Sequence, residues 1–195
     1  MRTRARKLFF SVSFFLLFFF SFTNVRAISL LEEDFNDGFD ENWEIVYFSP
    51  SSGSSIWDLN NWKINTEHQY GIELTHDQMR TFSIAGEADW DNYIFSLDML
   101  AKQGVDKNVL FRYVNKNNWY GLHMTGHGIY FGIQENGNYL DEKISDFSFS
   151  NKDYHLSIII LENRLSFYVD NQEVVDNYEM FKNSIEKGKI GLYVS

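Results

Sequence analysis

The sequence contains no cysteine and only one proline. The absence of cysteine excludes disulfides, a thiol nucleophile, a thiolate zinc site and a lipid attached to an N-terminal cysteine. Stability must therefore come from an apolar core. Long apolar runs are also missing after residue 27, so no later segment is apolar enough to cross a bilayer.

Residues 1–27 have the pattern of a secretory signal peptide. Four basic residues lie within the first seven positions, and an apolar run interrupted only by serines extends over residues 8–22. Val25-Arg26-Ala27 then places small residues at the two positions that signal peptidase reads. The run of about 15 residues is shorter than the ~20 that a membrane span needs, although an uncleaved anchor is the alternative. We therefore predict a secreted, extracellular protein whose mature domain spans residues 28–195.

Positive charge is scarce once the signal is removed. The signal carries five of the 17 Lys and Arg residues and none of the 27 Asp and Glu residues, so residues 28–195 have a formal charge of −15. A field of that sign repels phosphate backbones, and nucleic acid is not expected as a partner. Calcium, which prefers oxygen ligands, is compatible with this charge. The remaining length suits one domain with one core.

Alternation of apolar and polar residues predicts many short strands. The clearest are 93–100, 109–114, 119–124, 129–134, 154–161, 164–170 and 189–194. Helical periodicity is almost absent, and only residues 177–186 are compatible with one helical turn. The fold class predicted from this pattern is all-β, a sandwich of two antiparallel sheets.

The three strands within residues 109–134 can be assigned to two faces. Loops of four residues join them, which fits antiparallel hairpins. The predicted core face contains Val109, Phe111, Tyr113, Tyr120, Leu122, Met124, Ile129, Phe131 and Ile133. The predicted outer face contains Leu110, Arg112, Val114, Trp119, Gly121, His123, Tyr130, Gly132 and Gln134.

The outer face is the candidate ligand site. Its aromatic rings suit the C–H side of a sugar ring, its polar groups suit sugar hydroxyls, and its two glycines leave space. If strand 93–100 pairs with strand 109–114, Asp98 lies beside Arg112. The predicted ligand-binding residues are Asp98, Arg112, Trp119, His123, Tyr130 and Gln134. Because they point away from the core, removing Arg112 or Trp119 is expected to weaken binding at little cost in stability. Ordinary exposed aromatics and a surface ion pair are the alternative.

An acidic group offers a catalytic alternative. Glu87, Asp89 and Asp91 occupy alternate positions, which in an extended segment share one face about 6.6 Å apart. A glycosidase needs two carboxyl groups roughly 5–10 Å apart, so the spacing fits. A solvated acidic loop is the other interpretation. The five histidines show no metal-ligand spacing, and neither a Ser-His-Asp arrangement nor a phosphate-binding glycine loop is apparent.

The order of several motifs resembles the concanavalin A-like superfamily, in its laminin-G-like and glycoside-hydrolase-16-like branches. The motifs are EDFNDG (33–38), GEADWDNYIFSLDM (86–99), LFRYVNKNNWYGLHM (110–124), DYHLSIIILENRLSFYVDNQEVVD (153–176) and GKIGLYV (188–194). The resemblance implies a jelly roll of two curved antiparallel sheets. It also implies carbohydrate binding or cleavage, with many members serving as non-catalytic modules.

Two departures from the family pattern affect these expectations. The family's last strand has no counterpart here, so either the chain is a fragment or its first strand has an open edge. The family often holds a structural calcium, for which Asp34 and Asp37 would supply oxygens, but the expected C-terminal Asp is missing. No other cofactor is expected. We predict a secreted, non-catalytic carbohydrate-binding module, with a glycoside hydrolase of the same fold or a protein–protein adhesion module as alternatives.

Overall fold

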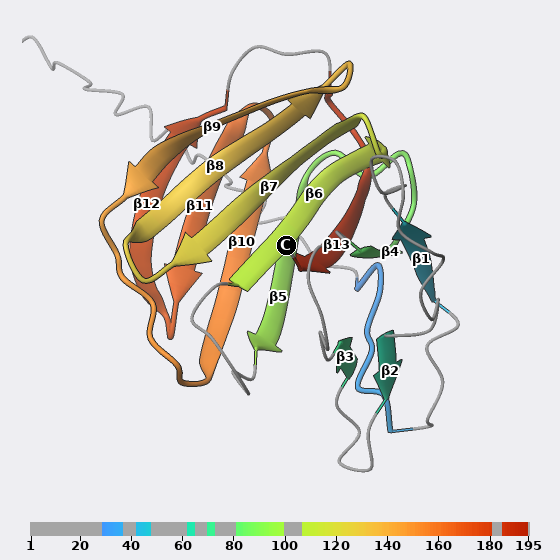
Figure 1. The fold of residues 1–195 in the computed structure, drawn as a ribbon, viewed down its shortest axis with the longest axis horizontal. Helices are drawn as coiled ribbons and strands as arrows, with labels where there is room; N and C mark the ends of the chain where they lie inside the picture. The colour runs from blue at the N-terminus through green and yellow to red at the C-terminus, as the bar shows by residue number, and fades with distance from the viewer. Residues whose placement is uncertain are drawn as a thin grey trace, which may run out of the picture. The chain divides into compact units, whose positions relative to one another are not determined.

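A computed structural model describes residues 29–36, 42–47, 62–64, 70–72, 81–99, 107–180 and 185–194. The described residues from Leu31 onward belong to one compact unit. Within these segments the structure is all-β, without helix (Figure 1). No helix in this part of the chain is long and apolar enough to span a membrane. The predicted signal peptide and Asp37 lie outside the described residues.

Two antiparallel sheets make up the sandwich. The seven-stranded sheet has the order β1 (Trp43–Tyr47), β4 (Thr81–Ala85), β13 (Lys189–Val194), β6 (Lys107–Asn115), β7 (Asn118–Thr125), β8 (Gly128–Glu135) and β9 (Asn138–Ser145). The four-stranded sheet has the order β12 (Gln172–Glu179), β11 (Arg164–Val169), β10 (Tyr154–Leu161) and β5 (Tyr93–Met99). A separate pair joins β2 (Trp62–Ile64) and β3 (Tyr70–Ile72). Figure 1 traces this strand order.

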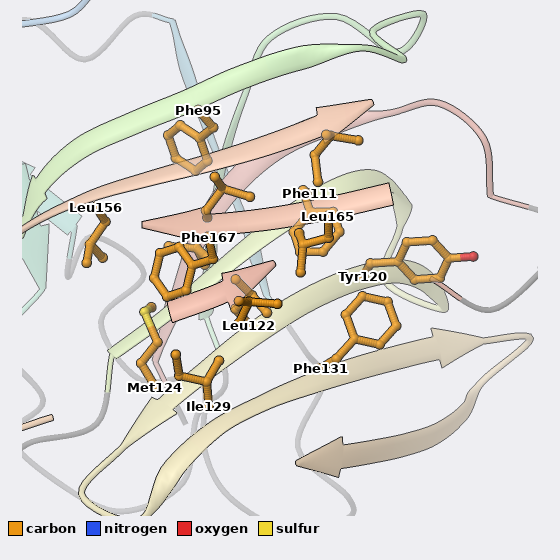
Figure 2. Close-up of a cluster of buried hydrophobic side chains, with 14 of the residues drawn as sticks. Phe95, Phe111, Tyr120, Leu122, Met124, Ile129, Phe131, Leu156, Leu165 and Phe167 are labelled. Carbon is orange, nitrogen blue, oxygen red and sulfur yellow. The ribbon is translucent and has the colours of Figure 1, made fainter. Parts of the chain in front are cut away.

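The core lies between the two large sheets. Strand alternation turns one set of side chains from each sheet inward, and the two sets meet there (Figure 2). The seven-stranded sheet contributes Phe111, Leu122, Met124, Ile129 and Phe131, and the four-stranded sheet contributes Phe95, Leu156, Leu165 and Phe167. The predicted core face is thereby confirmed, with Tyr113 as its one exception.

The exception arises from a β-bulge in β6. The register between β6 and β7 breaks after Phe111, and Arg112 has φ of 49°. A bulge inserts one residue into a strand and so inverts the faces that follow it. Tyr113 consequently packs on the outer face, where its ring meets Phe82 edge-on at 6.0 Å. Arg112 turns the other way, so the predicted faces of these two residues are wrong.

Strand β5 belongs to the four-stranded sheet. It pairs with β10, with Asp98 opposite His155, and does not pair with β6. The expected neighbourhood of Asp98 and Arg112 is therefore wrong. The helical turn expected from residue 177 is also wrong where the structure describes it, because β12 continues to Glu179.

Candidate functional site

An aromatic cluster covers much of the outer face of the seven-stranded sheet. It consists of Phe82, Tyr113, Trp119, Tyr139 and Tyr193, which come from five strands. Ring centroids lie 5.4 Å apart for Phe82 and Trp119 and 5.8 Å apart for Trp119 and Tyr193. Trp119 is only 1% exposed. Trp119 is therefore a packed residue, and its burial removes the basis for expecting that its removal costs little stability.

Three glycines lie in one row across the sheet beneath these rings, with Leu110 between two of them. Gly191 pairs across the sheet with Leu110, Leu110 with Gly121, and Gly121 with Gly132. A Cβ on Gly121 would lie 3.2 Å from the Trp119 ring, and one on Gly132 would lie 2.8 Å from the Tyr139 hydroxyl. Neighbouring side chains thus occupy the space that the glycines provide, where the sequence predicted space for a ligand.

A polar group interrupts the aromatic cluster at His123. Its Nε2 lies 3.0 Å from the Tyr139 hydroxyl and also bonds the Tyr193 hydroxyl. The His123 and Tyr139 rings stack with an interplanar angle of 29°. Two hydroxyls and one imidazole nitrogen therefore meet beside the aromatic rings of this cluster. Such polar groups among aromatic rings are typical of ligand sites.

One part of this face that is open to solvent lies on β7–β9. We define the β7–β9 patch as His123, Tyr130, Tyr139, Asp141 and Lys143. Tyr130 is half-buried and pairs with His123 on one side and Lys143 on the other. Asp141 and Lys143 are exposed. The Lys143 amine lies 2.6 Å from the Asp146 carboxylate, and this hydrogen bond raises the pKa of Lys143.

The structure brings together four of the six predicted ligand-binding residues. His123 and Tyr130 belong to the β7–β9 patch, while Trp119 and Gln134 are neighbours across β7 and β8 and are buried. Asp98 is exposed on the four-stranded sheet, where its carboxylate lies 2.7 Å from His155. Arg112 is 4% exposed and faces away from the site.

Arg112 joins three separate segments of the chain. Its guanidinium donates to the backbone carbonyls of Ile185 (3.3 Å), Asp91 (3.4 Å) and Glu162. Burial lowers the pKa of Arg112 from its usual value. The expectation that Arg112 binds ligand at an exposed position therefore loses its structural basis.

The acidic group at residues 87–91 does not form an extended segment. The amide of Trp90 donates to the Glu87 carbonyl at 3.4 Å, which closes a turn before β5. Glu87, Asp89 and Asp91 are all exposed, and Asp91 accepts from the amide of Asn92 at 2.7 Å. In this turn the three acidic side chains do not share one face of a strand. The predicted catalytic spacing depended on that shared face.

The first described segment was expected to contribute to a calcium site. Asp34 accepts hydrogen bonds from the Asn36 amide at 3.0 Å and from its side-chain nitrogen at 2.6 Å. Among the described residues no group of three or more His, Asp or Glu side chains could hold a metal ion. Calcium binding that includes Asp37 stays a prediction.

Strand β9 supplies three patch residues that the sequence reasoning missed. Its sequence NYLDEKIS is polar and lacks clear alternation. A signal was nevertheless present, because Asn136-Gly137 precedes it and both residues have positive φ, 50° and 82°. Asn-Gly between two strands is a strong indicator of a tight hairpin.

Comparisons with known proteins agree on the fold. No family model and no curated protein matches the chain. Among solved structures, the carbohydrate binding module CBM66 from Bacillus subtilis is similar with 21% identity and a TM-score of 0.58, over 78% of this chain and 87% of that one. A Bacillus licheniformis beta-glucanase is similar with 14% identity and a TM-score of 0.50, over 83% and 82%. The protein therefore has the concanavalin A-like jelly-roll fold, as predicted.

Proposed function

We propose that the protein is a secreted module that binds carbohydrate through the β7–β9 patch and is non-catalytic toward that carbohydrate. The observation that carries this proposal is the meeting of His123 and the Tyr139 hydroxyl beside the half-buried Tyr130. The tyrosine rings offer faces for the apolar side of a sugar, and the imidazole and hydroxyls offer hydrogen bonds to its oxygens. The similar CBM66 domain, named as a carbohydrate binding module, supports the same class of ligand.

Binding is favoured over cleavage by the charges on this face. Glycoside hydrolysis needs two carboxyl groups flanking the bond. Strand alternation places only Asp141 as a carboxylate on the outer face of β6–β9, all of which the structure describes. Asp141 is exposed and has no second acid beside it on these strands. Secretion, the lack of a nucleic-acid partner and the absence of an essential cofactor stay predictions.

The test begins with a glycan array and continues with calorimetric titration of the best ligand. Tyr130→Ala and His123→Gln should each weaken binding about tenfold, which corresponds to about 1.4 kcal/mol. Tyr168→Ala is the matched control, since Tyr168 is a half-buried tyrosine on the outer face of the four-stranded sheet. If Tyr168→Ala reduces the affinity and the two patch variants do not, the site is on the other sheet and the proposal is wrong.

A second arm tests the absence of catalysis. Incubation of the protein with the bound polysaccharide should release no soluble oligosaccharide detectable by mass spectrometry. Release that disappears in Asp141→Asn would contradict the non-catalytic assignment. Gly132→Ala provides a further check, because the added Cβ would displace the Tyr139 hydroxyl or His123, which lie 2.8 and 3.1 Å away. This variant should fold and lose binding.

A further inference from the structure

The outer face of the four-stranded sheet contains a chain of hydrogen bonds between side chains from β5 and β10. His155 Nδ1 lies 2.7 Å from Asp98 Oδ1, and His155 Nε2 lies 3.4 Å from Ser157 Oγ. Ser157 Oγ is in turn 2.8 Å from Ser96 Oγ. The register explains the geometry, since Asp98 pairs with His155 and Ser96 with Ser157. The sequence concealed the arrangement because the aspartate and the serine lie far apart along the chain.

Elementary hydrogen-bond rules fix the direction of these bonds. An ionised Asp98 can only accept, so His155 donates from Nδ1, and in the neutral imidazole Nε2 then presents a lone pair. Ser157 then donates to Nε2, and Ser96 donates to the Ser157 oxygen. Activation of a serine requires that its hydroxyl donate to a base and that a third group orient this base. A serine–imidazole distance slightly beyond ideal is common before substrate binds.

The surroundings indicate the kind of substrate. An open depression of about 370 Å³ adjoins the chain and is lined by Asp98, Asp153, Tyr154, His155 and Asp170. Its three carboxylates disfavour anionic substrates. Ile94 and Ile159 are the next outward-facing pair along these strands after Ser96 and Ser157, and they form an apolar strip in which Ile94 is 67% exposed. A neutral ester fits this combination, with its acyl chain over the strip and its alcohol in the depression.

We propose that Ser157, His155 and Asp98 form a hydrolytic site for neutral acyl esters, separate from the glycan-binding patch. Ser157 Oγ attacks the ester carbonyl while its proton passes to His155 Nε2, and Asp98 holds the resulting imidazolium. The imidazolium then protonates the leaving alkoxide as the C–O bond breaks, which leaves an acyl-serine. Water attacks this acyl group and loses a proton to His155. The imidazolium returns that proton to the Ser157 oxygen as the acyl C–O bond breaks, which releases the carboxylic acid and regenerates the Ser157 hydroxyl and the neutral imidazole.

Ser96 acts as a positioning residue. Its hydroxyl directs a hydrogen at the Ser157 oxygen, which turns the Ser157 proton toward His155. Once Ser157 has attacked, the same hydroxyl lies beside the developing oxyanion and can donate to it. Strand β10 lies between β5 and β11, so its backbone amides are engaged in the sheet, and a side-chain hydroxyl takes the place of an amide donor in this geometry.

The test uses a biotinylated fluorophosphonate, whose phosphorus is attacked by an activated serine with loss of fluoride. Purified protein should incorporate one label per chain, and peptide mass spectrometry should place it on Ser157. Ser157→Ala should abolish labelling, and His155→Gln should slow it about 100-fold, the lower end of what a general base contributes. Ser166→Ala, a half-buried serine on the same face, should label at the normal rate.

Esterase activity provides the second measurement, with p-nitrophenyl acetate as substrate. Hydrolysis should fall at least tenfold in Ser157→Ala and in Asp98→Asn, and Ser96→Ala should lower kcat with little change in KM. All four side chains lie on the outer surface of the sheet, and melting temperatures verify that the variants fold. Absence of label, label on a different residue, or labelling that His155→Gln and Asp98→Asn leave unchanged would each overturn the proposal. None of these outcomes depends on whether the protein binds glycan.

Discussion

Replacement of Arg112 by alanine should lower the free energy of unfolding severely, although the position lies in an ordinary-looking strand sequence. The guanidinium donates to carbonyls in the turn before β5, in the β10–β11 turn and in the segment before β13. The first two segments adjoin strands of the four-stranded sheet, whereas the third adjoins a strand of the seven-stranded sheet. No single sheet therefore links all three. Loss of the side chain therefore leaves three buried or half-buried acceptors without their donor.

The magnitude follows from the number and kind of bonds. A hydrogen bond to a charged group contributes about 1.5–3 kcal/mol, and three such bonds would contribute about 4.5–9 kcal/mol. Burial of the cation opposes this gain, as the lowered pKa of Arg112 indicates. The expected net loss is about 3–5 kcal/mol, less than the sum of the three bonds, because removing the side chain also removes the cost of burying the cation.

A comparison with glycine isolates the backbone contribution. Arg112 has φ of 49°, where a residue with a Cβ is strained by about 1 kcal/mol or more and glycine is not. Arg112→Gly should therefore be more stable than Arg112→Ala by about 1 kcal/mol. In an ordinary strand position glycine is the less stable of the two, so the sign of the difference reports the bulge directly.

Urea unfolding followed by tryptophan fluorescence would measure these differences. The control is Arg164→Ala, because Arg164 forms an exposed ion pair with Glu179 at 3.4 Å and should cost less than about 1 kcal/mol. If Arg112→Ala costs no more than Arg164→Ala, the stabilising role of the three carbonyl bonds is refuted. If alanine is as stable as glycine at position 112, the positive φ is not a source of strain.

Two further predictions concern aromatic residues. Trp119→Ala should lower the free energy of unfolding by about 3–5 kcal/mol in thermal unfolding, as much as Phe111→Ala. Both side chains are fully packed, on opposite faces of the same sheet. A loss below about 1 kcal/mol would contradict the burial of Trp119. Burial raises the pKa of Tyr93 to about 12 from an ordinary value of 10. The folded state thus favours the protonated phenol. The free energy of unfolding that this preference contributes, up to about 3 kcal/mol, is complete below pH 10 and is lost as the pH rises from 10 to 12. Tyr93→Phe should flatten the pH dependence of urea unfolding in that window, and an unchanged slope would contradict the assignment.

The fold could be predicted because it rests on local patterns. Alternation in residues 109–134 identified the inward side chains, and Figure 2 shows them meeting the other sheet. The same rule failed at Arg112 and Tyr113 because alternation assumes an uninterrupted strand. One inserted residue inverts every later face, and nothing in the sequence FRYV marks the insertion.

The site was less accessible to sequence reasoning for two reasons. Alternation says which way a side chain points, but it does not say which strand lies next to it. Asp98 was therefore placed beside Arg112, whereas the structure pairs it with His155. Alternation also does not reveal whether neighbours fill the space above a glycine. Gly121 and Gly132 were correctly placed on the outer face, yet Trp119 and Tyr139 lie over them.

The central position of β13 has a consequence for the order of folding. This strand pairs with β4 and β6, which are made much earlier in synthesis, and it separates β1 and β4 from the β6–β9 meander. Until residues 189–194 are available, the seven-stranded sheet has a gap in its middle, and the two halves expose backbone edges to each other. Long-range pairing of this kind makes folding slow and late. We expect the seven-stranded sheet to stay incomplete in the nascent protein until residues 189–194 have been synthesised.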